Sequence, residues 1–537
     1  MMKEREDATE QPFDAIIIGS GIGGLAFASL MAQVAKKRVL VLERHFKLGG
    51  FTHSFSRNGY TWDVGLHYVG HLAQGTLFRR LFDFITRSQV AWSKMPHRFE
   101  VFSYPKFSFR VPADRNQYIQ DLIREFPDEE TGIRKYFDDL RRVAGWFGRE
   151  TWSWSAPGLL AWPVRIINRR LRQRALQTTR EYLDHTVADE RLKALLVSQW
   201  GDYGLPPSRS AFAMHAAVAD SYLQGGWYPE GGSAAIAKCI CRTIEEAGGV
   251  CLVNHEVTNI IVEEGKAVGV NVRIKRGGRT EQRSFRSPLV VSDAGAHQTF
   301  AKLLPEHVCV PFKAELEQMA AGTTTVATLY LGLNEDPRRL GFQGENHWIF
   351  SSCRHENASD LAQDQITMAF LSFPSMKDPH AKRHTAEVII SVPYQSFQDW
   401  QGTTWMKRDE SYRKLKDRLT ETLLAYVDQR YPGFRDLVAY KELSTPLTIE
   451  SFTGHQQGAI YGLPATPERI RRRWFGARTS IEGLLLTGTD VCSLGIEGAL
   501  MGGVFAAGTA LGPLGFFRVM AAAHRHAAAN NRRRENP

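Results

Sequence analysis

The chain has 537 residues, of which 43% are hydrophobic, and a formal net charge of +10 at pH 7. This length is too great for one hydrophobic core and predicts two joined domains of unequal size, while the apolar share excludes extended disorder outside the two ends. The six cysteines lack the spacing of disulfides or metal ligands, so we expect a reducing compartment and no metal site.

The N-terminal residues predict where the protein is located. Residues 1–12 are charged and lack the apolar core of a secretory signal. No run of about 18 apolar residues occurs anywhere, so we expect no membrane span. We therefore expect a cytoplasmic protein whose contact with a membrane, if any, is peripheral.

A glycine turn near the N-terminus predicts a dinucleotide site. Residues 15–18 are a short apolar run typical of a buried parallel strand, and Gly19, Gly21 and Gly24 follow with the G-x-G-x-x-G spacing. Gly19 permits the tight turn, Gly21 lets a pyrophosphate approach bare backbone, and Gly24 lets the following helix pack against the strand. The helix N-terminus then faces the phosphates.

A second strand with an acid at its end supports the same prediction. Residues 39–42 are apolar, and Glu43 follows them about 20 residues after the last glycine of the turn. A carboxylate at this place accepts hydrogen bonds from an adenosine ribose. Because strand, turn, helix, second strand and acid all agree, we prefer a dinucleotide site over a purely structural glycine turn.

The next segment predicts a hairpin and then loops that could close on a cofactor. Residues 51–55 and 60–64 alternate around an Arg-Asn-Gly turn. His67 follows in a loop, where it either acts on cofactor or substrate or only satisfies a buried carbonyl.

Residues 99–228 break the dinucleotide-fold pattern and predict an inserted domain. A hairpin at 99–111 precedes amphipathic helices at 118–126 and 132–147. The apolar, Trp-bearing run 156–162 is followed by five arginines before residue 175, and the tail after 515 carries further arginines next to Phe516 and Phe517. Aromatic residues beside arginines suit a bilayer interface, so we expect residues 156–174 and the tail to be either a membrane-docking surface or a solvated basic face.

The middle of the chain is predicted to add strands to the first domain and then to form a second sheet. Residues 250–262 and 267–274 predict a hairpin, in which Val257 could read an adenine, and 289–296 predicts a further buried strand. The alternating segments 324–333, 347–351, 366–373 and 388–393 predict a sheet that forms the wall of a substrate pocket, followed by a helix at 410–431. We expect the tail after 515 to be frayed or bound to lipid.

The C-terminal region indicates that the dinucleotide is one that carries a flavin. Residues 484–490 predict a strand that ends at Asp490, and Gly495 opens an apolar helix. In flavoproteins this acid reaches the ribityl and diphosphate region, and the helix N-terminus stabilises negative charge on the reduced ring. The alternative is that Gly488 and Gly495 merely end their elements.

These elements predict a division of the chain into segments. The predicted segments are an FAD-binding domain in three parts (13–98, 229–322 and 451–515), a substrate domain in two parts (99–228, with membrane-facing helices at 151–175, and 323–450), and a basic tail (516–537).

Several motifs together resemble one flavoprotein family. GSGIGGLA, WDVGLHYVG, WGDYGLPP, YPEGGSAAIA and TGTDVCSLGIEGALMGG resemble the retinol saturase branch of the phytoene desaturase and carotenoid isomerase flavoproteins, over nearly the whole chain. The resemblance implies non-covalent FAD and an α/β fold, in which a Rossmann-like FAD-binding domain of the amine oxidase and phytoene desaturase type carries an inserted α+β substrate domain. It implies FAD contacts at ten positions: Gly19, Gly21, Gly24, Glu43, Arg44, Gly50, Val257, Asp490, Ile496 and Glu497.

The resemblance also implies redox or isomerase chemistry on a double bond of a long apolar lipid such as a retinoid or carotenoid. Saturation by hydride transfer from reduced flavin needs a proton donor, for which His67, Tyr68 and Glu497 are the candidates in that order. Desaturation or cis-trans isomerisation of a carotenoid or unsaturated fatty acyl chain stays open, as does a catalytically inactive, flavin-bearing binding protein at a membrane. The sequence contains one dinucleotide site, so the electron donor is unknown, and no nucleic-acid-binding module surrounds the basic clusters.

Overall fold

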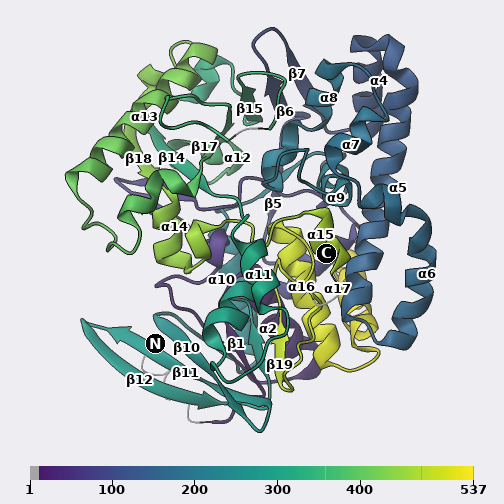
Figure 1. Ribbon diagram of the computed structural model, residues 1–537, viewed down its shortest axis with the longest axis vertical. Coiled ribbons are helices and arrows are strands. Elements are labelled where there is room, and N and C mark those ends of the chain that lie inside the picture. Colours follow the sequence, from purple (N-terminus) through teal and green to yellow (C-terminus); the bar gives the residue numbers. More distant parts are fainter. Residues whose placement is uncertain (1–10, 357, 473–474, 536–537) are drawn as a thin grey trace.

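A computed structural model describes residues 11–356, 358–472 and 475–535 of the chain. Its centre is a five-stranded parallel sheet (Figure 1) with the strand order β19-β13-β1-β2-β9. The strands are β1 (Ala15–Ile18), β2 (Val39–Leu42), β9 (Val250–Leu252), β13 (Val290–Ser292) and β19 (Leu484–Leu486). All are fully buried, as the continuous apolar runs predict for a parallel sheet covered on both faces.

Helices from both ends and from the middle of the chain surround this sheet. They are α2 (Ile22–Ala35), α3 (Leu77–Ile85), α10 (Ala234–Glu246), α11 (Lys313–Ala320), α16 (Gly495–Ala510) and α17 (Gly515–Glu535). Helix α16 packs directly on α2, because a Cβ at Gly503 would lie only 2.6 Å from the carbonyl oxygen of Gly23. The last segment of the chain is therefore fixed against the first.

The strand prediction for residues 250–262 was wrong in one respect. Asn254 has a left-handed φ of 60°, which divides the segment into β9 of the parallel sheet and β10 (His255–Glu263) of a separate sheet. In that three-stranded antiparallel sheet β10 pairs with β11 (Lys266–Arg276), which pairs with β12 (Arg279–Arg286). The polar sequence of β12 concealed a strand that is largely exposed.

A second large sheet has seven strands in the order β18-β14-β17-β16-β15-β6-β7. The strands are β6 (Arg98–Ser103), β7 (Ser108–Pro112), β14 (Val326–Leu333), β15 (Asn346–Phe350), β16 (Met368–Ser372), β17 (His384–Ser391) and β18 (Val438–Ser444). All pairs are antiparallel except β6 with β15. The hairpin predicted at 99–111 thus joins the strands predicted about 200 residues later.

Alternation along these strands gives the sheet two different faces. One face packs against α13 (Glu410–Arg430) and contains Leu329, Leu331 and Val388. The other face presents residues such as Tyr330 and Trp348 to a cavity. Two further antiparallel pairs are β3 (Ser54–Arg57) with β4 (Tyr60–Asp63) and β5 (Trp92–Lys94) with β8 (Trp227–Pro229). They belong to segments of the chain that connect strands of the two large sheets. Three short helices complete this part: α12 (Pro374–Lys377), α14 (Pro446–Thr453) and α15 (Pro467–Arg471).

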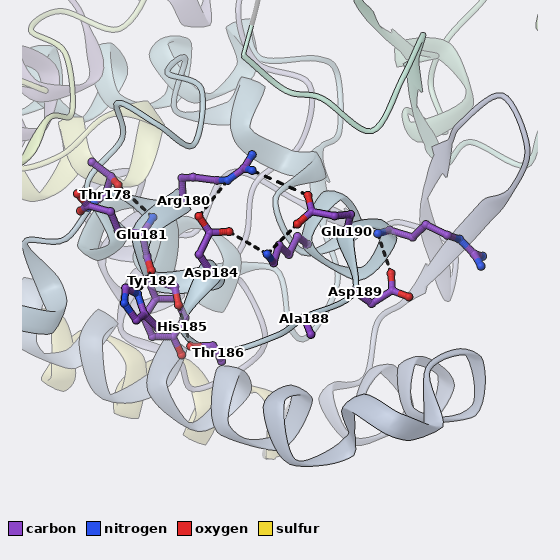
Figure 2. A network of polar contacts seen from close by, with 12 residues as sticks. Thr178, Arg180, Glu181, Tyr182, Asp184, His185, Thr186, Ala188, Asp189 and Glu190 are labelled. Carbon is purple, nitrogen blue, oxygen red and sulfur yellow. Dashed lines mark hydrogen bonds and ion pairs between the residues drawn. The ribbon is translucent and has the colours of Figure 1, made fainter.

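A helical lobe, blue in Figure 1, adjoins both sheets. It consists of α4 (Arg115–Glu125), α5 (Glu130–Ser155), α6 (Gly158–Ala175), α7 (Thr179–Asp184), α8 (Glu190–Leu196) and α9 (Phe212–Ser221). Lys193 joins α7 to α8, since it donates to Asp184 at 2.9 Å and to Glu190 at 2.8 Å. Figure 2 shows Asp184 and Glu190 within this network. Both carboxylates are exposed, so the network fixes the local turn and adds little stability. Helix α8 leads into the turn η4 (Ser198–Asp202), which reaches the cavity.

The structure corrects the prediction of a frayed tail, and membrane docking stays a prediction. Two of the five arginines of α6 are paired within the protein, Arg172 with Glu150 and Arg174 with Asp139. The tail is neither frayed nor detached, since α17 buries Val519 and Ala523 fully or nearly so. The side chains of Arg533 and Arg534 lie outside the described residues. A search of the described helices finds none with the length and apolarity required to cross a membrane.

The packing of α16 on α2 predicts the effect of two glycine substitutions. Gly503→Ala places a Cβ 2.6 Å from backbone oxygen, so it should destabilise the protein by about 1–3 kcal/mol. The matched control is Gly148→Ala in α5, where a Cβ meets nothing within 4 Å and should stabilise by about 0.5–1 kcal/mol. Denaturant titration of both variants checks this, and equal stabilities would contradict the packing described.

Candidate functional site

A cavity of about 960 Å³ lies at the carboxyl edge of the parallel sheet. It extends from the glycine turn after β1, past the N-terminus of α16, to the aromatic face of the seven-stranded sheet. Parallel α/β sheets bind ligands at this edge, and a cavity of this size holds a large organic ligand. The cavity therefore has a part suited to a dinucleotide and a second part suited to an apolar substrate.

The glycine turn has the geometry that a pyrophosphate requires. Gly19 has a φ of +93°, which favours glycine, and a Cβ at Gly24 would lie 2.6 Å from the carbonyl oxygen of Gly19. The structure describes every residue in the first turn of α2, and none of them is acidic. The N-cap residue is Gly21, which has no side chain to cap the helix. Bare backbone and an available helix N-terminus together fit a dinucleotide.

The predicted adenosine contacts gather at one end of this groove. Glu43 is buried and its Oε2 accepts from the backbone N (3.0 Å) and Oγ (2.6 Å) of Ser20, so it joins the end of β2 to the glycine turn. Arg44, Val257 and Gly50 also line the groove. A Cβ at Gly50 would lie 3.1 Å from the Cα of Gly21, which places the Gly50 loop over the turn.

The C-terminal contacts lie at the other end of the groove. Asp490 is buried and accepts backbone hydrogen bonds from Leu463 (2.9 Å) and Ala296 (2.7 Å), so its carboxylate ties two loops together. Ile496 and Glu497 stand in the first turn of α16 and line the cavity. Oε2 of Glu497 lies 3.1 Å from Nδ1 of His71, a histidine that the sequence analysis did not select. Burial lowers the pKa of His71, but Glu497 and Asp220 outweigh it and raise that pKa to about 10.

A partly buried carboxyl at the glycine turn was missed. Asp293 directly follows β13, and a Cβ at Gly21 would lie 2.4 Å from its Oδ2. Burial raises the pKa of Asp293 to about 8, although the amides of Gly24 and Gly21 oppose the increase. The charge of Asp293 therefore bears directly on how well this helix N-terminus can hold an anion. The position of Asp293 at the carboxyl end of the strand beside β1 is the sequence signal that could have identified it.

The remaining catalytic candidates stand where the two parts of the cavity meet. Nδ1 of His67 lies 2.8 Å from Oε2 of the fully buried Glu387, and its ring centroid lies 5.4 Å from that of Phe370. Lys377 holds the same loop by donating to the carbonyl oxygen of His67 at 2.9 Å. Tyr68 stacks on Tyr222 with centroids 4.3 Å apart. His67, Tyr68 and Glu497 all line the cavity, and their catalytic roles stay predictions.

Comparison with known proteins identifies the family. Residues 17–85 match the model of the NAD(P)-binding Rossmann-like domain. The human all-trans-retinol 13,14-reductase is 32% identical over 548 aligned residues, which cover 94% of this chain and 86% of that protein. The chain belongs to the all-trans-retinol 13,14-reductase family. The resemblance predicted from the motifs is therefore confirmed.

More distant relatives extend this family assignment. Prolycopene isomerase 2 from an Oncidium hybrid cultivar, a chloroplastic protein, is 27% identical over 95% of this chain and 85% of its own length. Among solved structures, a double mutant of putrescine oxidase superposes with a TM-score of 0.62 at 15% identity, covering 93% of this chain and 99% of that chain. This likeness confirms the predicted fold class, a Rossmann-like domain of the amine oxidase type combined with an inserted domain.

The position of Asp293 predicts how dinucleotide binding in this family member depends on pH. Above about pH 8 the carboxylate adds negative charge beside the predicted pyrophosphate site, so the affinity for FAD, the predicted cofactor, should fall by up to about tenfold per pH unit. Asp293→Asn should bind FAD with an affinity that does not change over this range. Flavin fluorescence titrations check this.

The exposed Asp336→Asn serves as the control and should behave as the wild type. A wild-type protein and an Asp293→Asn variant with the same dependence on pH would contradict the role given to Asp293.

Proposed function

We propose that the protein is an FAD-dependent oxidoreductase that saturates a carbon-carbon double bond of a long apolar lipid, such as a retinoid or carotenoid. The observation that supports this most directly is the single cavity, in which the dinucleotide groove opens into an aromatic chamber. Membership of a family whose relatives are named as a retinol reductase supports the reaction class.

FAD fits the groove better than a nicotinamide dinucleotide would. The groove continues past the adenosine end to the N-terminus of α16, whose backbone amides and dipole favour negative charge on a reduced flavin ring. When bound and reduced, the flavin supplies hydride to one carbon of a double bond.

The protein's own residues would position the substrate and exclude water from the cofactor. Trp348, Phe370 and Tyr461 form an apolar chamber wall, which would hold a polyene beside the cofactor and exclude water from it. His67 and Tyr68 stand at the junction of the chamber and the groove, where a proton must reach the second carbon.

Isomerisation is the second candidate function, because a prolycopene isomerase is among the relatives. Desaturation of a carotenoid or a fatty acyl chain uses the same cavity. An inactive flavin-bearing binding protein would retain the groove and show no turnover. Product mass separates the reactions, since saturation adds two hydrogens and isomerisation none.

The proposed reaction predicts both a spectrum and a product. Purified protein should carry FAD bands near about 375 and 450 nm that bleach on reduction. Anaerobically reduced protein, mixed with retinol, a carotenoid or an unsaturated fatty acid, should regain these bands with one substrate and yield a product two hydrogens heavier. An unchanged mass would identify an isomerase, and persistent bleaching with every compound would contradict an oxidoreductase acting on these lipids.

We also propose that α6 docks the protein on a membrane from which the lipid enters. Leu159, Trp162 and Ile167 of α6 are 88%, 65% and 61% exposed, and the arginines Arg169 and Arg170 stand among them. The neighbouring helix α5 contributes Trp152 to the cavity, next to Phe517 of α17, which is itself exposed. Apolar side chains beside cationic ones favour an anionic bilayer surface.

This surface predicts binding to lipid vesicles. The wild type should sediment with phosphatidylcholine vesicles more strongly when phosphatidylserine is included, and Leu159→Ser with Trp162→Ser should weaken binding about tenfold or more. Arg169→Gln should weaken only binding to anionic vesicles, by about fivefold. Met406→Ser, which removes another exposed apolar side chain, is the matched control. Equal losses for all variants would contradict docking through α6.

A further inference from the structure

The chamber contains a pair of acids that no ion pair compensates. Glu100 of β6 is fully buried, and Asp202 ends η4 and lines the cavity, where it stays partly accessible. Among the described residues no Lys, Arg or His forms an ion pair with either carboxyl. Burial without a paired cation favours the neutral form of each carboxyl, so we infer that both retain a proton near neutral pH.

Tyr68 joins this pair to the loop of the catalytic candidates. Its hydroxyl donates to Oδ2 of Asp202 at 2.5 Å and stands near Glu100 as well. Glu100 is fixed from the opposite side, because Nε2 of Gln199 donates to it at 2.7 Å and Nε1 of Trp348 at 3.2 Å. Three groups therefore follow one another: the buried carboxyl of Glu100, the hydroxyl of Tyr68 and the carboxyl of Asp202 at the chamber wall.

Burial of the pair favours its protonated state, and two nearby cationic side chains oppose it. Burial raises the pKa of both carboxyls, and the charge of Asp202 raises the pKa of Glu100 further. His67 opposes this at Asp202, and Lys377 opposes it at Glu100, although burial lowers the pKa of Lys377 itself to about 7. The other titratable groups that face the pair are neutral tyrosines: Tyr118, Tyr203, Tyr222 and Tyr461.

We propose that Asp202 is the acid that protonates the second carbon of the double bond, and that Tyr68 and Glu100 restore its proton. This inference rests on the proposed saturation. When bound and reduced, FAD would supply hydride, with its two electrons, to one carbon. The O–H bond of Asp202 breaks as a C–H bond forms at the other carbon. Tyr68 then passes its hydroxyl proton to Asp202 and takes the proton of Glu100, so that the alkene gains one hydride and one proton.

This assignment changes the roles predicted from the sequence. Tyr68 becomes a positioning and relay group, since its hydroxyl already donates to Asp202. His67 is directed at Glu387 and belongs to a separate buried pair. Glu497 is engaged by His71. Asp202 lies within the predicted motif WGDYGLPP, but nothing in the sequence places it beside Glu100.

The test uses full-length FAD-loaded protein, reduced anaerobically and mixed with the lipid that the wild type saturates. Asp202→Asn should slow flavin reoxidation by about 10²-fold or more, because a general acid contributes this much. Glu100→Gln removes the proton that restores Asp202, so with excess reductant the first turnover should keep its rate and later turnovers should slow. Tyr68→Phe removes a hydrogen bond that favours the carboxylate, so the fall in rate at high pH should begin at higher pH.

Asp139→Asn is the control, since this carboxylate is buried, as Glu100 is, but lies in α5, paired with Arg174. It should leave the rate and its dependence on pH unchanged. A wild-type rate in Asp202→Asn would overturn the proposal. So would a loss in Tyr68→Phe as large as that in Asp202→Asn, because the phenol would then be the acid.

A second measurement does not depend on turnover. Infrared spectra of the wild type minus Glu100→Gln, taken near neutral pH, should show the C=O band of a protonated carboxylic acid that shifts in D₂O. Absence of this band would overturn the proton-holding pair. If the reduced wild type converts none of the lipids, the proposed function fails, and the infrared result still decides whether the pair holds a proton.

Discussion

The close approach of two glycine turns, one from each end of the chain, is the contact on which the rest of the structure depends. A Cβ at Gly23 would lie 2.4 Å from the Cα of Gly488, and a Cβ at Gly502 would lie 2.2 Å from the carbonyl oxygen of Gly488. Only bare backbone permits this spacing. It brings the N-termini of α2 and α16 to the same edge of the parallel sheet, and therefore aims two helix dipoles into one cavity.

The second large sheet completes the cavity by presenting one of its faces to that edge. Its alternating strands bury aliphatic side chains under α13 and turn Tyr330, Trp348 and Phe370 towards the cofactor groove. Burial raises the pKa of carboxyls that line or adjoin this cavity, as at Asp293 in the groove and at the pair of Glu100 and Asp202 in the chamber. The proposed binding of FAD, exclusion of water and storage of protons would therefore all depend on one packing arrangement.

The sequence predicted the parts of the site that are encoded locally. The glycine turn, Glu43 and the helix at Gly495 were found because strand, turn and helix follow one another within a few residues. Glu100, Asp202 and Asp293 were missed because their environments arise only from tertiary contacts, with Glu100 and Asp202 on separate elements far apart in the chain. The polar strand β12 and the arginine-rich helix α17 were missed because pairing with β11 and burial of Val519 outweigh their composition. The segment boundaries and the catalytic roles stay predictions.

The central claim is that FAD occupies the groove formed where the two glycine turns meet. Equilibrium titration of the purified protein with FAD, followed by flavin fluorescence, tests it most directly when Gly23→Ala is measured beside the wild type. We expect the wild type to bind one FAD per chain and Gly23→Ala to bind it far more weakly, since its Cβ would force Gly488 away. A wild type that binds no FAD, or a Gly23→Ala variant that binds it equally well, would contradict the account.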